Sequence, residues 1–394
     1  MTFLCILIVG ICNIRSFYIL GNLSIKLKKN NYKELCQEIF GKNSKITIFL
    51  VITLNIYTIG LIIIHQAFIY RLLGGIINII GRYNYESTLA FISNSFWKNI
   101  WTKLCVNYGF SIFIIFPLFY TREVKKLNIL STIEVFTTLF ILFVILFQFP
   151  FYFIDFLNKD NIKEKSNTDI NVYNISSGFT KQFHFFQSFS LLFFCFAGDR
   201  SFLPNLNHFE RPTPQRNPNI YYIALGIDMI IYLFFSIIGY LNDPNDVVDI
   251  IIERKNIWSI DLIMTFVRML LIPISISKIQ IYYNNWRNSF CDLFKNIINL
   301  KSSKNDFIFT IITLFITTLL ASVYQNIVGY ISLIGGFCIV FPSFLIPSIM
   351  YMIDSNSQKS IPKVVLQMIF GIVLCIVGYI SGILRLIDII SDEK

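Results

Sequence analysis

The residues best suited to hold a polar solute lie where an apolar stretch of the sequence is interrupted. In the segment 183–204, a largely apolar run reaches Ala197–Gly198–Asp199–Arg200. Gly198 lowers the cost of leaving helical geometry, and the charges of Asp199 and Arg200 would be costly against lipid. Main-chain N–H and C=O groups freed at such a break suit a zwitterion, because helix ends carry partial charges. The alternative is a helix that ends at Ala197, with the charged pair at the membrane interface.

A second group of polar residues lies in the segment 257–283. Arg268 is followed by Pro273, which removes one backbone donor and frees a carbonyl one turn earlier. Ser275 and Ser277 then offer oxygens to a small hard cation or to a solute. The alternative is a proline kink whose serine hydroxyls bond to their own helix. The sequence leaves both interpretations open.

Other polar or small residues in apolar segments have weaker functional signals. Gly335 and Gly336 permit close helix packing, and Asp228 is an acid without an obvious partner. His65, next to Gln66, either relays a proton or is a hydrogen-bonded structural histidine. The sequence contains no P-loop, no Ser/His/Asp set and no zinc signature, so it predicts no enzyme, no ATP-driven pump, no cofactor and no metal site.

The composition requires that these residues be positioned by membrane helices. Of 394 residues, 55% are apolar and 14% are charged, and the mean hydropathy is +0.63. A soluble globule of this length lacks the interior to hide that much apolar surface. Apolar windows predict ten membrane spans. These spans are Phe3–Leu23, Ile46–Leu73, Leu104–Phe119, Ile129–Leu157, Phe183–Pro204, Ile220–Leu241, Ile257–Tyr283, Phe307–Val323, Val328–Ile353 and Val364–Ile387.

The net charge of +10 is explained by orientation. Alternate loops between the spans place 17 basic and 7 acidic residues on one side of the membrane. Lys and Arg accumulate in cytoplasmic loops, so this side is predicted to be cytoplasmic and nucleic acid is not needed as a partner. Met1 then lies outside at the start of a span, which predicts that one upstream helix is missing.

Taken together, the motifs resemble the amino acid/auxin permease family over nearly the whole chain. The matching segments are Asn31–Tyr32–Lys33–Glu34–Leu35 with Phe40–Gly41–Lys42, Ile115–Phe116–Pro117–Leu118 with Leu127 and Ser131, Phe194 and Phe196 with Gly198, Leu203, Pro204 and Pro212, Tyr232 with Gly239–Tyr240, and Ser332–Leu333–Ile334–Gly335 with Pro347.

The resemblance implies an all-α membrane protein with a LeuT-like, five-plus-five inverted-repeat transporter fold and a final helix. By that template the ten predicted helices are the second to the eleventh, so the first repeat is incomplete. The expected organisation is a single transmembrane domain over 1–394. It comprises an incomplete first repeat at 1–157, an external loop at 158–182, a second repeat at 183–353 and the final helix at 364–387.

The sequence and the resemblance together predict a secondary active transporter that moves amino acids by alternating access. The coupling ion is predicted to be a proton rather than sodium. The membrane is either the plasma membrane or an internal, vacuole-like membrane. A transporter-like sensor subunit that binds an amino acid without moving it is the alternative. The predicted substrate-binding residues are Cys195, Phe196, Ala197, Gly198 and Asp199, and the predicted coupling-ion residues are Asp199, Ser275 and Ser277.

Overall fold

The computed structural model describes most of the chain, and every regular element in the described part is helical. The described residues are 2–29, 31–42, 44–84, 100–120, 127–165, 189–197, 203, 217–242, 262–293, 303–323, 326–353 and 361–392. A helix satisfies its own backbone hydrogen bonds, which is a requirement for an apolar segment in lipid. The long helices are α1 (Thr2–Leu27), α3 (Lys45–Asn84), α7 (Leu127–Lys165), α10 (Asn217–Asn242), α11 (Leu262–Leu293), α12 (Ser303–Val323) and α15 (Ile361–Asp392).

Shorter helical elements complete the described part. The short α-helices are α2 (Tyr32–Phe40), α5 (Ile100–Phe110), α6 (Phe116–Tyr120), α13 (Ile327–Ile334) and α14 (Ile346–Ile353). Three π-helical turns are η1 (Ser111–Ile115), η3 (Gly335–Ile339) and η4 (Phe341–Leu345).

Seven stretches within the described residues are long and apolar enough to cross a membrane. They are Cys5–Leu27, Lys45–Ile76, Thr132–Ile154, Tyr222–Leu241, Ile263–Cys291, Asn305–Val323 and Ile327–Ile353. Two predicted spans correspond to shorter apolar helices, Leu104–Phe119 and Met368–Leu384. The remaining predicted span, Phe183–Pro204, is described only at 189–197 and at Leu203. The chain is therefore an integral, multi-pass membrane protein, and the count of ten helices and the inverted repeat remain predictions.

Several helices extend beyond their predicted ends, α11 and α7 among them. Helix α11 continues past Tyr283 to Leu293, because aromatic residues of its last turns still pack: Trp286 stacks on Phe309 of α12, with ring centroids 5.0 Å apart. Helix α7 continues past Leu157 to Lys165, into the segment expected as an external loop. The Lys and Glu residues of that extension are good helix formers, so loss of apolar periodicity does not end the helix there.

A proline lies two or three residues after the end of each π-helical turn in the described part. Segment η1 precedes Pro117, η3 precedes Pro342, and η4 precedes Pro347. A proline lacks the N–H that would bond to the carbonyl four residues earlier, and its ring crowds that carbonyl. Widening the preceding turn relieves the crowding, and such π-bulges are frequent at functional sites.

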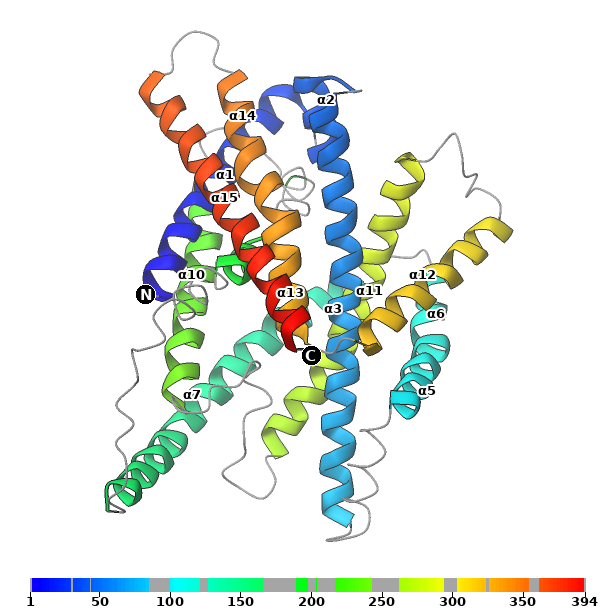
Figure 1. Cartoon of the computed structure of the whole chain (residues 1–394), viewed down its shortest axis with the longest axis vertical. Coiled ribbons are helices and arrows are strands. Elements are labelled where there is room, and N and C mark those ends of the chain that lie inside the picture. The colour runs from blue at the N-terminus through cyan, green and yellow to red at the C-terminus, as the bar shows by residue number, and fades with distance from the viewer. Residues whose placement is uncertain are drawn as a thin grey trace. The chain divides into compact units, whose positions relative to one another are not determined.

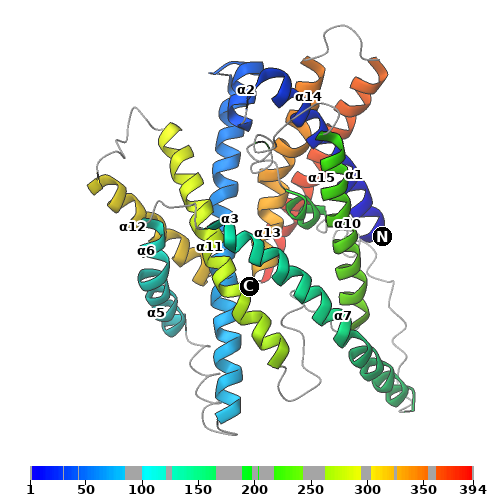
Figure 2. The same ribbon diagram turned by 180° about the vertical axis from the view of Figure 1, so that it is seen from behind.

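The chain folds as two compact units, each described here by itself. Unit 1 comprises Met1–Tyr57, Asn171–Ser236 and Val328–Lys394, and unit 2 comprises Thr58–Ile170 and Ile237–Ile327. In unit 1, α14 and α15 run side by side, and α15 also packs against η3 and η4 (Figure 1). In unit 2, α7 begins next to α11, and α12 packs against α5 and α6 (Figure 2). Each unit contains helices from both halves of the sequence. The boundaries of the compact units therefore do not coincide with those of the predicted repeats.

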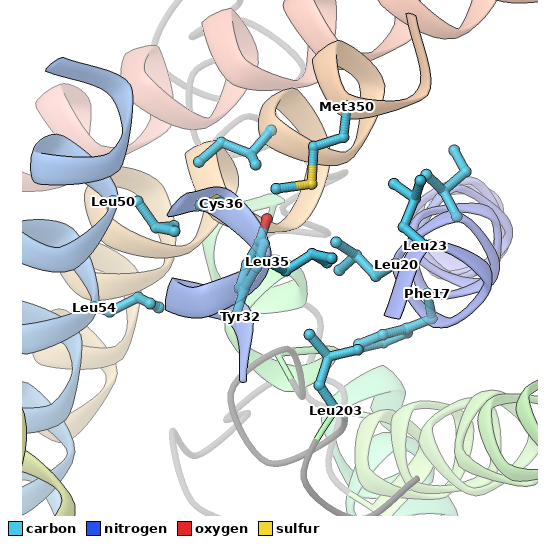
Figure 3. Close-up of a cluster of buried hydrophobic side chains, with 12 residues drawn as sticks. Phe17, Leu20, Leu23, Tyr32, Leu35, Cys36, Leu50, Leu54, Leu203 and Met350 are labelled. Atoms are coloured by element: carbon cyan, nitrogen blue, oxygen red, sulfur yellow. The ribbon is translucent and has the colours of Figure 1, made fainter. Parts of the chain in front are cut away.

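The core of unit 1 is centred on the short helix α2. Leu35 and Cys36 of α2 pack with Leu20 and Leu23 of α1, and Met350 of α14 lies in the same cluster (Figure 3). Asn31 accepts a hydrogen bond from the backbone N–H of Lys33 and so caps the start of α2. Burial raises the pKa of the Cys36 thiol, so this cysteine stays neutral and acts as a small apolar core residue.

Candidate functional site

The helix in the middle of the predicted binding segment ends inside the described part of unit 1. Residues 189–195 are helical, Phe196 is in a turn and Ala197 is non-helical. The N–H of Phe196 bonds to the carbonyl of Leu192 at 3.1 Å, but the N–H of Ala197 bonds to Phe194, only three residues back. The last turn therefore tightens before the helix stops, as helix ends often do.

Of the five predicted substrate-binding residues, the structure describes three. Cys195, Phe196 and Ala197 form the end of this helix, and Gly198 and Asp199 lie outside the described residues. The ring of Phe196 is buried, whereas the side chain of Cys195 is exposed. Whether the chain is unwound beyond Ala197 therefore stays a prediction.

Two side chains from other helices of unit 1 donate hydrogen bonds to the carbonyls at this helix end. The hydroxyl of Tyr232 in α10 donates to the Cys195 carbonyl at 2.9 Å. The amide nitrogen of Asn13 in α1 donates to the Phe196 carbonyl. The Phe196 ring also meets the Tyr232 ring edge-on, with centroids 5.2 Å apart. The carbonyls, which the helix itself cannot satisfy, are thus held in fixed positions.

The helix end has the electrostatics of a site for a positively charged group. The carboxyl end of a helix carries a partial negative charge, and a carbonyl oxygen that accepts one hydrogen bond retains a second lone pair. Asn13 Oδ1 and Ser16 Oγ, one turn apart on α1, are both buried and have no hydrogen-bond partner within the described chain. The two carbonyl oxygens and Asn13 Oδ1 are thus hydrogen-bond acceptors gathered at this helix end.

Close packing against η3 fixes this short helix in unit 1. A Cβ atom added at Gly335 would lie 1.9 Å from the Ser190 carbonyl oxygen, so only glycine permits this approach. The backbone N–H of Ser190 bonds to Ser381 Oγ of α15 at 3.3 Å. The Phe193 ring meets Phe344 of η4 edge-on, with centroids 5.3 Å apart. The packing role predicted for Gly335 is therefore visible in the structure.

The predicted ion-binding serines lie in α11 of unit 2. Ser275 and Ser277 are both buried. Ser277 Oγ donates to the carbonyl of Ile274 in its own helix at 2.7 Å. That bond uses the proton of the Ser277 hydroxyl and leaves the oxygen lone pairs available. A bond of this kind is what the proline-kink interpretation expects, and the role of the two serines as ion ligands remains a prediction.

Sequence inspection did not single out Asn13 or Glu134. Asn13 is a polar residue in an otherwise apolar part of α1, and Glu134 is an acid near the start of the α7 span. A search for every polar residue inside the predicted spans would have found both. Their partners, Phe196 and Lys278, lie 183 and 144 residues away, so no local pattern could have predicted the contacts.

An apolar groove in unit 1 contains one charged residue. The groove has a volume of about 320 Å³ and lies between α1, η4 and α15. Arg15 of α1 lines it, and the guanidinium lies 5.4 Å from the ring centroid of Tyr18 and 5.5 Å from that of Tyr351. Cation–π contacts of this kind stabilise a charge in an apolar setting. Among the described residues, no cluster of His, Cys, Asp or Glu side chains is placed to hold a metal ion.

These features define a multi-pass membrane protein in which a short helix ends at a polar, protein-lined position. The chain belongs to the family of transmembrane amino acid transporter proteins, whose sequence model matches residues 1–391. It is also 23% identical to a protein of Plasmodium berghei (strain Anka) named "Putative amino acid transporter AAT1". The similarity covers 95% of this chain but only 62% of the length of that relative.

Proposed function

We propose that the chain is a secondary active transporter that moves amino acids across a membrane by alternating access. The single observation that carries this proposal is the helix end at Cys195–Ala197 in a chain of the amino acid transporter family. A helix that stops within an apolar segment needs a reason, since unpaired backbone groups are costly in lipid. Binding the charged ends of an amino acid supplies one.

In this proposal, each described residue at the helix end has a part. The carbonyl oxygens of Cys195 and Phe196, with Asn13 Oδ1, receive the ammonium group of the substrate. Tyr232 and Asn13 hold those carbonyls in place, so they are positioning residues. The N–H groups that would bind the carboxylate are expected at Gly198 and Asp199, which lie outside the described residues.

A proton is the proposed coupling ion, with Asp199 as the carrier predicted from the sequence.

The experiment that tests the proposal is uptake of radiolabelled amino acids into proteoliposomes that contain the purified chain. We expect accumulation above empty liposomes, stimulation by an inward proton gradient in sodium-free buffer, and loss of that stimulation with a protonophore. Saturable binding without accumulation would support the sensor alternative. Uptake that requires sodium would overturn the choice of coupling ion.

Asp199 is tested in the same assay. Replacing Asp199→Asn removes the titratable carboxylate and changes the side-chain volume little. If Asp199 carries the proton, uptake by this variant no longer responds to external pH. An unchanged pH dependence would remove Asp199 from the coupling role.

A further inference from the structure

An ion pair joins two membrane helices of unit 2. Lys278 Nζ of α11 lies 2.8 Å from Glu134 Oε2 of α7. Both residues fall within apolar stretches long enough to span a membrane, Ile263–Cys291 and Thr132–Ile154. Charges in such stretches are costly against lipid and typically mark ion pathways.

A second ion pair on α11 provides an internal comparison. Arg287 Nη1 lies 3.4 Å from Asp306 Oδ2 of α12, and these side chains are only 11% and 8% exposed. Next to this pair, the Tyr283 hydroxyl is 2.7 Å from Thr310 Oγ1. Polar neighbours therefore shield the Arg287–Asp306 pair. The Lys278 and Glu134 side chains are 28% and 33% exposed. The Lys278–Glu134 pair is therefore the more accessible of the two.

The titratable groups that face the accessible pair come from two helices. Tyr282, one turn after Lys278 on α11, interacts electrostatically with both members of the pair. His65 of α3 interacts electrostatically with Lys278, and its ring stacks on Tyr282 with centroids 5.6 Å apart. Segments η1 and α6 also pack against α11, and their one titratable residue is Tyr120, the last residue of α6. Asp306 of α12 is held by Arg287.

Polar atoms near this pair lack internal partners. His65 Nδ1 is buried without a hydrogen-bond partner among the residues that the structure describes. The same is true of both side-chain amide atoms of the neighbouring residue, Gln66. Buried polar groups are normally satisfied, so the unpaired nitrogen of His65, a residue that interacts with Lys278, points to a further polar partner at this site.

We propose that the Glu134–Lys278 pair is a proton-binding site that couples proton movement to transport. An incoming proton adds to the carboxylate of Glu134, which becomes a neutral carboxyl group. The pair changes from a net charge of zero to +1, and the attraction between the two side chains is lost. The link between α7 and α11 is then released, which permits these helices to rearrange.

This inference rests on the proposed transport function and adds to it a site that the sequence analysis did not identify. It makes a prediction that is separate from the one for Asp199. The Glu134 carboxylate has two states: ionised and paired with Lys278, or protonated and unpaired. Ion coupling requires an element with two such states.

The test compares Glu134→Gln with the wild type in two proteoliposome assays. The first measures uptake driven by an inward proton gradient. The second measures exchange of labelled for unlabelled amino acid, which needs no net proton movement. We expect Glu134→Gln to lose gradient stimulation and fall to the uptake seen without a gradient, while exchange continues. Glu134→Asp keeps the carboxylate and is expected to keep the stimulation.

Glu38→Gln is the matched control. Glu38 forms an ion pair with Lys29 at 3.5 Å, and this pair lies outside the membrane spans at the exposed face of α2. The same chemical change there is expected to leave both assays at the wild-type level. If Glu134→Gln retains full gradient stimulation, the inferred site is wrong.

Lys278→Met provides a second measurement should Glu134→Gln fail to fold. Removing the ammonium leaves Glu134 without its stabilising charge, so a proton binds more readily. The pH of half-maximal uptake is expected to rise, and a pH profile identical to the wild type would also overturn the inference. Absence of all uptake and exchange in the wild type would instead contradict the transport function itself.

Discussion

At the scale of single residues, the site is made by contacts between residues far apart in the sequence. The sequence predicts a break around Gly198 because glycine and two charges interrupt an apolar run. Its alternative, a helix end at Ala197, lies close to the observed last helical residue, Cys195. The sequence does not predict that Tyr232 and Asn13 reach the carbonyls there. Such contacts depend on how α1 and α10 pack, which no local pattern in the chain specifies.

Replacing Tyr232→Phe tests whether these contacts position the helix end. The variant removes the donor to the Cys195 carbonyl and keeps the aromatic contact with Phe196. Loss of one such hydrogen bond is expected to cost about 1 kcal/mol of stability. We expect a lower melting temperature in detergent and a raised KM for amino acid uptake, because the carbonyl is less well fixed.

Tyr222→Phe is the control for that change. Tyr222 lies on the same helix, α10, but its side chain is 52% exposed. The control is expected to match the wild type in both measurements. If Tyr232→Phe and Tyr222→Phe behave alike, the hydroxyl of Tyr232 has no positioning role.

At the scale of elements, glycine and proline explain how the interrupted helices of the described chain are built. Three prolines each follow a π-helical turn, and Gly335 begins one of those turns. The sequence predicts close packing at Gly335 and Gly336, and its prolines mark where these helices become irregular. It does not reveal that the irregularity is a widened turn, because a proline is compatible with a kink, a 3₁₀ turn or a π-bulge.

Replacing Gly335→Ala tests the contact between η3 and the helix at 189–195. The new Cβ would lie 1.9 Å from a backbone oxygen, that of Ser190, so a main-chain segment has to move. Overpacking of this kind costs roughly 1–3 kcal/mol or more. We expect a clear fall in melting temperature and a loss of uptake, since the displaced helix is the one that ends at the proposed substrate site.

Gly226→Ala is the matched glycine substitution. Gly226 lies in α10, and an added Cβ there would meet no atom within 4 Å. Alanine favours helix over glycine by up to about 1 kcal/mol, so this variant is expected to be as stable as the wild type or slightly more stable. Equal losses in the two variants would argue against a specific contact at Gly335.

At the scale of the whole molecule, the apolar pattern predicts the membrane helices well but not their grouping. Span positions follow from hydropathy, because lipid demands about 20 apolar residues per crossing. The two compact units instead interleave the chain: α1 belongs with residues 328–394, and Thr58–Ile170 belongs with Ile237–Ile327. Which helices associate depends on small residues and polar contacts spread along the sequence, such as Gly336 against Gly378 in unit 1.

The charge distribution makes one further prediction, the orientation of the chain in its membrane. Positive charge collects on the side that contains Lys42, Lys126 and Lys301, so that side is expected to face the cytoplasm. An impermeant amine-reactive label added to sealed vesicles of known orientation, followed by peptide mass spectrometry, reads this directly from native lysines. With the cytoplasmic face outward, these lysines should be labelled and Lys163 and Lys165 protected until detergent is added. Labelling of Lys163 and Lys165 before detergent, with Lys42 protected, would reverse the topology. It would also place the amino end of α7, with Glu134 close to it, at the opposite face from the one expected here.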